Sequence, residues 1–160
     1  MRGAFRCPEC GSETPLNLNP FPTADCIIEY TADDGREAIV LIWRKNEPVG
    51  WAIPGGFVDY GESVEDAVRR EMKEETNLEL KDLQLLGVYS DPDRDPRFHT
   101  VSTVYIARGA GRLEAGDDAV RAVAYALEDM PSEEEIVFDH FHIISDYLQR
   151  KKERRETDDG

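Results

Sequence analysis

The sequence has no uninterrupted apolar stretch of the roughly 18 residues that a membrane-spanning helix requires. Its first residues, MRGAFRCPEC, also lack the apolar core of a secretory signal peptide. We therefore expect a cytoplasmic protein that does not enter membranes. With 160 residues, the chain is long enough for one domain with its own hydrophobic core and, at most, a small appendage.

Positive charge is also scarce in this chain. It carries 19 Lys and Arg residues against 34 Asp and Glu residues, which gives a formal net charge of −15. This balance argues against non-specific binding to nucleic acids and against binding to anionic membrane surfaces. A phosphorylated small molecule is still an allowed ligand, because bound divalent cations and a few arginines can reverse the field locally.

The chain has only 3 cysteines, which excludes a zinc site built from four cysteines of one chain. Cys7 and Cys10 have the spacing of half a zinc ribbon, whereas Cys26 stands in an apolar run that is typical of a strand. Three interpretations of Cys7 and Cys10 stay open. They are a structural zinc site completed by histidines or by the second subunit of a homodimer, a metal-free turn, and a redox pair.

Apolar patterning indicates how the rest of the chain is organised. Strands are predicted at residues 23–30, 38–43, 51–54, 83–89, 100–107 and 121–126. An amphipathic helix is predicted at 138–150, with Phe141, Ile144 and Leu148 on its apolar face. Strands with one helix among them and one after them favour an α/β fold with a mixed sheet flanked by helices. We expect this domain at residues 21–150, after a cysteine-containing extension at 1–20 and before a charged tail at 151–160.

The first predicted helix, which follows a possible N-cap at Ser63, has an inward face that ends in carboxylates. Glu71, Glu74 and Glu75 are three or four residues apart, so their carboxylates crowd one region and repel each other unless a cation lies among them. Clustered carboxylate oxygens are hard ligands that suit Mg²⁺ or Mn²⁺. The alternative is a polar helix end without a metal.

Together with the residues before it, this helix resembles a known family. Gly56, Glu62 and the run REMKEETNL that starts at Arg70 match the Nudix box, the loop-helix-loop of hydrolases that cleave nucleoside diphosphates linked to another group. The one departure is Asn77, where the family has Gly; after Gly, Asn best tolerates the left-handed conformation that ends a helix. The resemblance implies a Nudix-type α/β/α sandwich with a mixed β-sheet at residues 21–150.

The resemblance also implies roles for the residues of the box. The implied metal ligands are Glu71 and Glu75, with Glu74 assisting and the Gly56 carbonyl as a further ligand. Arg70 would be structural and would hold Glu62 or Glu74 in place. Gly55 and Gly56 let the backbone approach a ligand closely.

Cleavage of a phosphoanhydride requires a positioned water molecule and neutralisation of the charge that moves onto the oxygens. The glutamates that hold the metal, Glu71, Glu74 and Glu75, are therefore the candidate catalytic residues. A further carboxylate can orient or deprotonate the water, and the candidates are Glu114, Asp117 and Asp118, with Asp118 preferred. The alternative is an ordinary acidic turn at these positions.

The loop at residues 90–99 is too charged for a simple turn and is the candidate substrate-binding segment. Arg94 and Arg97 can each donate paired hydrogen bonds to phosphate. Phe98, His99 and Trp43 can contact a base or a ribose. The alternative is an exposed loop in which the arginines pair with nearby aspartates, namely Asp91, Asp93 or Asp95.

The segment SDPDRDPRFHTVSTVY after the box and the FDH near the end resemble the ADP-ribose pyrophosphatase branch of Nudix enzymes. This resemblance implies hydrolysis of ADP-ribose to AMP and ribose 5-phosphate. One alternative is another small-molecule substrate, such as NADH, an oxidised nucleoside triphosphate or a dinucleoside polyphosphate. The other is a module that senses a nucleotide without turnover, which the complete cluster of Glu71, Glu74 and Glu75 disfavours.

Overall fold

The computed structural model describes residues 3–6, 9–16, 19–32, 34–116 and 119–158. Within them, a seven-stranded sheet has the order β5-β4-β3-β8-β7, with β6 paired to β3 and β9 paired to β4. Its strands are β3 (Phe21–Thr31), β4 (Glu37–Arg44), β5 (Trp51–Ala52), β6 (Gly55–Phe57), β7 (Glu79–Tyr89), β8 (Thr100–Ala110) and β9 (Ala119–Ala126). The β3 strand runs parallel to β8 and antiparallel to β4, so the sheet is mixed, as predicted.

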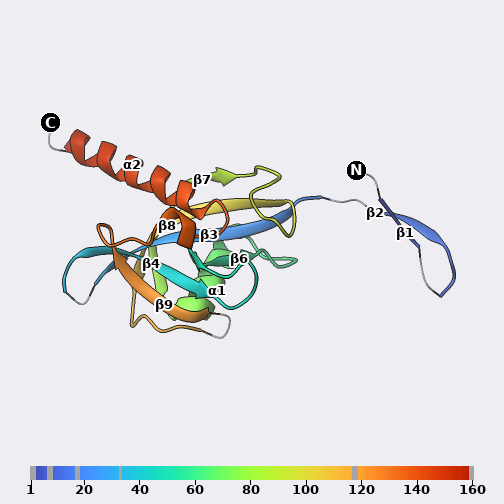
Figure 1. Cartoon of the computed structure of the whole chain (residues 1–160), viewed down its shortest axis with the longest axis horizontal. Coiled ribbons are helices and arrows are strands. Elements are labelled where there is room, and N and C mark those ends of the chain that lie inside the picture. The colour runs from blue at the N-terminus through green and yellow to red at the C-terminus, as the bar shows by residue number, and fades with distance from the viewer. Residues whose placement is uncertain (1–2, 7–8, 17–18, 33, 117–118, 159–160) are drawn as a thin grey trace.

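The two α-helices, α1 (Val64–Thr76) and α2 (His140–Asp158), lie on opposite sides of the sheet, with α2 above and α1 below it in Figure 1. Successive side chains of a strand point to opposite faces. Accordingly, Cys26 and Ile28 of β3 belong to the buried cluster that contains Met72 of α1, whereas Ile27 belongs to the cluster that contains Ile143 of α2. The α/β/α sandwich is therefore confirmed.

Helix α1 begins and ends at the residues that the sequence predicted. At its start, the Ser63 side chain accepts a hydrogen bond from the Asp66 amide at 3.1 Å. At its end, Asn77 adopts the left-handed conformation with φ of 59°, and its amide donates to the Lys73 carbonyl at 3.1 Å. Both contacts satisfy backbone groups that have no partner inside the helix. Asn77 therefore ends the helix at a position where Gly was expected.

Helix α2 differs from the prediction at both ends. It starts at His140 instead of residue 138, and it continues through residues 151–158, which were expected to form a charged tail. Contacts with β7 accompany the extension: Arg150 donates to the Leu85 carbonyl at 2.8 Å, and Arg154 donates to the Gln84 side chain at 2.9 Å. Because these contacts are polar, the sequence of the extension has no apolar periodicity from which the helix could have been predicted.

The segment before the domain contains a pair of strands that the sequence did not predict. The strands β1 (Gly3–Arg6) and β2 (Glu13–Leu16) pair antiparallel in a separate two-stranded sheet.

Neither α-helix of the described residues combines the length and the apolar composition needed to cross a membrane.

Candidate active site

A network of hydrogen bonds centred on Arg70 connects the loop before α1 to the helix itself. The Arg70 guanidinium donates to Glu62 Oε1 at 2.7 Å and to the Phe57 carbonyl at 3.0 Å. It also donates to Glu71 Oε1 at 2.7 Å and to Glu74 Oε2 at 3.2 Å. Because one side chain holds groups from both segments, the glycines that precede Phe57 have a defined position relative to the carboxylates of α1.

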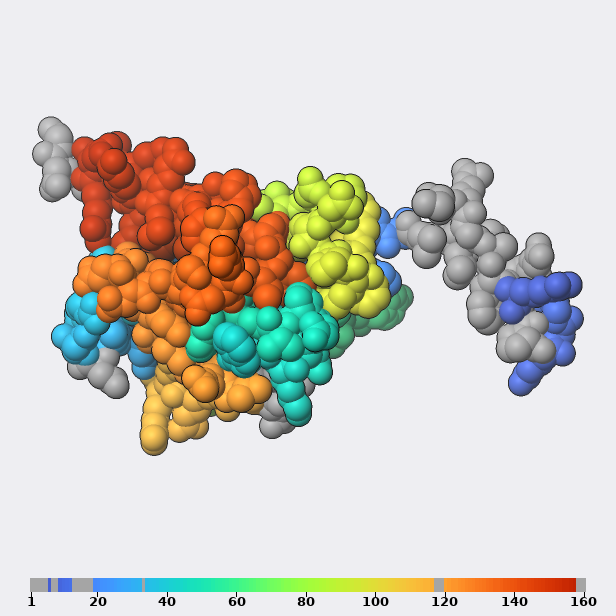
Figure 2. Space-filling model, in the orientation of Figure 1, coloured from blue at the N-terminus to red at the C-terminus, as the bar shows by residue number. Residues whose placement is uncertain are grey.

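A cavity of about 410 Å³ lies beside this network. Its walls come from the strands β3, β4 and β6, the helix α1, the loop at residues 90–99 and the segment before α2. Figure 2 shows the loop at 90–99, in yellow-green, beside the turn that follows β4. The charged residues that concern the chemistry are the acids Asp25, Glu71 and Glu75 and the arginines Arg44, Arg94 and Arg97. One cavity thus combines carboxylates with guanidinium groups, as a metal-bound phosphate ligand requires.

The carboxyl groups of the cavity are strongly desolvated. Glu75 is only 9% exposed, and the Gly55 amide donates to its Oε2 at 2.9 Å. Burial, with a smaller contribution from the charges of Glu71 and Asp25, raises the pKa of Glu75 to about 8. Burial likewise raises the pKa of Asp25 to about 6, against the effect of a hydrogen bond from the Ser102 hydroxyl. These carboxylates repel each other, so a cation among them would be stabilised.

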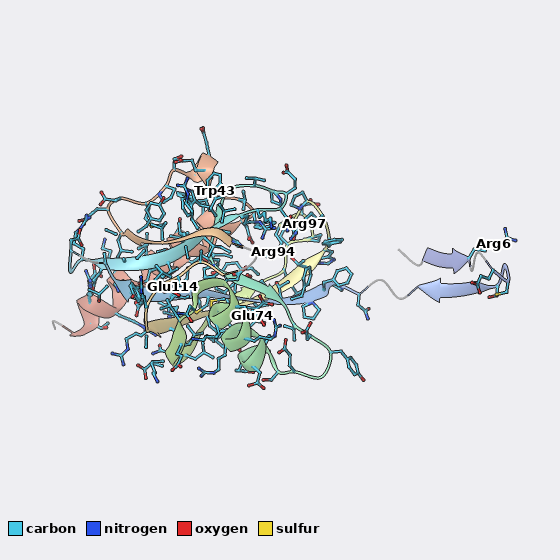
Figure 3. The ribbon with its side chains drawn as sticks, turned by 90° about the horizontal axis from the view of Figure 1, so that it is seen from below. Arg6, Trp43, Glu74, Arg94, Arg97 and Glu114 are labelled. Atoms are coloured by element: carbon cyan, nitrogen blue, oxygen red, sulfur yellow. The ribbon has the colours of Figure 1, made fainter. Side chains whose placement is uncertain are left out.

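The glutamates of α1 fit a divalent cation in their chemistry. Arg70 Nη1 contacts both Glu71 and Glu74, so these two carboxylates already converge on one positively charged atom. Glu71 and Glu75 line the cavity, whereas the Glu74 side chain is 60% exposed and projects from α1 in Figure 3. In the described part of the chain, no three acidic, His or Cys side chains are already grouped around a metal position. The ligand set remains a prediction supported by its oxygen donors.

Two of the cavity arginines are engaged by carboxylates. Arg94 is buried and donates to both oxygens of Asp139, at 2.9 and 2.7 Å. Arg97 donates to both oxygens of Asp95, at 3.0 and 2.9 Å. Pairing with a neighbouring aspartate was the alternative interpretation of this loop, and Arg97 follows it. The partner of Arg94 lies 45 residues further along the chain.

Arg44 is different. Its Nε donates to the Pro48 carbonyl at 3.0 Å, and no carboxylate of the described residues lies within salt-bridge distance of its guanidinium. Burial lowers the pKa of Arg44, and the charge of Arg97 lowers it further. A partly buried cation without a carboxylate partner is costly unless a ligand compensates its charge. Arg44, next to the exposed Lys45 in the same cavity wall, is therefore placed to bind an anion.

The three residues that were predicted to contact a base or a ribose do not line the cavity. Trp43 packs edge to face on Trp51, with 5.2 Å between ring centroids. Phe98 is 46% exposed and packs on Phe21, with 5.5 Å between centroids. His99 is exposed. Trp43 thus contributes to packing, while the other two stand at the surface beside Arg97, which Figure 3 labels close to Arg94.

Gly55 and Gly56 lie where any side chain would collide with the site. A Cβ on Gly55 would overlap Asp25 Oδ1 and would lie 2.7 Å from the Ala24 carbonyl oxygen. A Cβ on Gly56 would overlap the Glu71 carboxylate. The backbone at both glycines thus lies directly against side chains of the site, while the predicted close approach to a ligand stays a prediction.

The mutation Gly55→Ala is therefore expected to destabilise the protein by about 1–3 kcal/mol, because the colliding Ala24 backbone cannot move aside. Gly87→Ala is the matched control, since its Cβ would lie at an ordinary 3.5 Å from the Tyr89 ring. Urea unfolding of both variants gives the free energies. Equal unfolding midpoints for the two variants would contradict the collision.

The predicted base Asp118 and its neighbour Asp117 lie outside the residues that the structure describes. The turn just before them packs on the end of α1: the Glu114 amide donates to the Thr76 carbonyl at 3.1 Å, and the Gly116 amide donates to the Glu75 carbonyl at 3.0 Å. The assignment of a base to this turn stays a prediction.

The cysteine pair is described only in part. Cys7 lies outside the described residues, and Cys10 is exposed, with its Sγ 3.1 Å from the Ser12 hydroxyl. Zinc binding by Cys7 and Cys10 therefore also stays a prediction.

The cavity residues that were given no role from the sequence include Asp25, Arg44, Phe138 and His140. Asp25 had a usable signal, because it is an acid inside a strand that is otherwise mostly apolar. Phe138 and His140 belong to the FDH segment, whose sequence was noted without a physical role. His140 is buried and accepts a hydrogen bond from the Ile53 amide at its Nδ1, at 3.1 Å. Burial, followed by the charge of Arg94, lowers the pKa of His140 to about 3 and keeps the ring neutral.

Comparison with known proteins gives matches over most of the chain. The NUDIX domain family matches residues 20–147. A Methanocaldococcus jannaschii protein described as an ADP-ribose pyrophosphatase is 50% identical over 139 residues, which cover 85% of this chain and 78% of that protein.

Two solved structures are similar. A MutT/nudix family protein from Enterococcus faecalis has a TM-score of 0.76 and 32% identity, over 87% of this chain and 64% of that one. The NUDIX domain of Shewanella oneidensis NrtR, in complex with ADP ribose, has a TM-score of 0.72 and 26% identity, over 82% of this chain and 88% of that one.

Proposed function

The chain belongs to the Nudix family, and from this premise we propose that it is a hydrolase that uses a divalent cation to split ADP-ribose into AMP and ribose 5-phosphate. The observation that carries the proposal is the composition of one cavity, whose wall holds Glu71 and Glu75 of α1 and Arg44, a cation with no carboxylate partner among the described residues. The similarity to a pyrophosphatase and to an ADP-ribose complex supports the choice of substrate.

In this proposal, Glu71 and Glu75 would hold Mg²⁺ or Mn²⁺, with Glu74 and the Gly56 carbonyl as further ligands. When bound, the cation supplies neutralisation of the diphosphate and polarisation of its phosphorus–oxygen bonds. The Gly55 amide orients the Glu75 carboxylate, and Arg70 orients Glu71. Water would add to one phosphorus while the bond from that phosphorus to the bridging oxygen breaks, and Asp118 is the proposed acceptor of the water proton.

The arginine side of the cavity would bind the phosphate oxygens that the cation leaves free. Arg44 is the proposed main contact, because its charge has no carboxylate partner in the described residues. Arg97 would assist, although Asp95 already occupies part of its guanidinium. Arg94 has a structural task, since its pairing with Asp139 joins the loop at 90–99 to the segment before α2. Phe98 and His99 remain proposed contacts of a base or ribose at the cavity rim.

A substrate panel tests this assignment against its alternatives. We expect kcat/KM for ADP-ribose to exceed the values for NADH, a dinucleoside polyphosphate and an oxidised nucleoside triphosphate by at least about tenfold. A wide preference for a triphosphate would overturn the substrate and leave the family assignment in place. Tight binding of ADP-ribose without turnover, with divalent cation present, would instead identify a sensing module.

A further inference from the structure

Phe138 has a backbone conformation that bulky residues rarely adopt. Its φ is 60°, in the left-handed region, and it stands two residues before the start of α2, in the wall of the cavity. A side chain with a Cβ is unfavourable there, and a bulky one is a genuine outlier. Such a conformation persists only where the surrounding structure imposes it, and it is often found at functional sites.

The segment around Phe138 is anchored on both sides. The Val137 amide donates to the Trp51 carbonyl at 2.9 Å. Asp139 receives both hydrogen bonds from Arg94, and His140 accepts the Ile53 amide. These contacts anchor the backbone immediately before and after Phe138, whose ring lies in the cavity wall. The strained conformation thus serves to place an aromatic ring at this point.

Two guanidinium groups lie over that ring. The distance from Cζ to the ring centroid is 4.8 Å for Arg44 and 5.2 Å for Arg97. The two cations are close enough for the charge of Arg97 to disfavour the charged form of Arg44. The face of an aromatic ring attracts cations, so the ring offsets part of their mutual repulsion. One ring therefore lies against two like charges in the cavity wall, and Arg97 also lies over the Phe98 ring, at 5.6 Å from its centroid.

We propose that Phe138 is a positioning residue, which holds Arg44 and Arg97 together as a clamp for the two phosphate groups of a nucleoside diphosphate derivative. The inference rests on the proposed function, because it takes the diphosphate of the substrate as the ligand. Two planar guanidinium groups can engage two phosphate groups at once, whereas a monophosphate fills only one of them. The clamp therefore favours the substrate over the product AMP.

The test compares two variants of Phe138 that remove the aromatic ring with one variant that keeps it. Phe138→Leu keeps an apolar side chain without the ring, and Phe138→Asn also removes the ring but tolerates the left-handed backbone. Both are expected to raise KM for ADP-ribose about tenfold, to change kcat by less than about threefold, and to leave inhibition by AMP within about threefold of wild type. Phe138→Tyr retains the ring and is expected to restore the wild-type KM.

Phe141→Leu is the matched control, because it makes the same change at an exposed ring of α2 and is expected to leave KM unchanged. An unchanged KM in Phe138→Leu and Phe138→Asn, or a Tyr variant no better than Leu, would overturn the clamp. If wild type binds ADP-ribose without turnover, the proposed function fails separately. Calorimetric binding of ADP-ribose then replaces KM, with the same tenfold loss expected and the same outcomes decisive.

Discussion

Replacing Glu75 with Gln is expected to lower kcat for ADP-ribose by about 1,000-fold while the protein stays folded. Gln keeps an oxygen that can accept the Gly55 amide, but it removes the negative charge that would hold the cation. Steady-state kinetics with saturating Mg²⁺ measures the loss. Glu79→Gln, which changes an exposed carboxylate on β7, is the matched control and is expected to retain wild-type activity.

The same substitution is expected to maintain or raise the melting temperature of the metal-free protein. Burial and the charges of Glu71 and Asp25 disfavour the ionised form of Glu75 in the folded protein, so Gln removes a cost that the metal-free folded state otherwise bears. Thermal unfolding in excess chelator measures this effect. Wild-type turnover in Glu75→Gln would refute the role of this carboxylate, and a large drop in melting temperature would show that the charge is a structural requirement.

Arg44→Gln is expected to lower kcat/KM for ADP-ribose by about 10- to 150-fold, which corresponds to the loss of one charge-assisted contact worth about 1.5–3 kcal/mol. Arg97→Gln is expected to cost less, because Asp95 already engages that guanidinium. Initial rates over a range of ADP-ribose concentrations give both values.

Arg36→Gln serves as the control for loss of a surface arginine. Its guanidinium pairs with Asp34, Glu128 and Asp129 and takes no part in the cavity wall. This variant is expected to match wild type. An unchanged kcat/KM in Arg44→Gln would remove the anion-binding role from Arg44 and, with it, one of the observations that carry the proposed function.

Features that depend on neighbouring residues could be predicted from the sequence. The start of α1 at Ser63 and its end at Asn77 depend on capping contacts that span four residues or fewer. The inward direction of Glu71 and Glu75 follows from helical periodicity. The buried strand around Cys26 could also be predicted, because its apolar residues follow one another in the sequence. Membership of the Nudix family, inferred from this local pattern, is confirmed.

Contacts between residues that are far apart in the sequence could not be predicted. Arg94 finds its partner at Asp139 instead of at a neighbouring aspartate, and no local pattern connects the two. Phe138 reaches Arg44 only because the segment before α2 packs against β5. The continuation of α2 beyond Arg150 is accompanied by a polar contact with β7, from Arg154 to Gln84, and a polar contact gives no apolar period in the sequence.

The most direct test of the account is chromatographic analysis of ADP-ribose incubated with the wild-type protein, once with Mg²⁺ and once with excess chelator. The account predicts AMP and ribose 5-phosphate in equal amounts with Mg²⁺ and neither product in chelator. Undiminished cleavage in excess chelator, or products other than these two monophosphates, would contradict it.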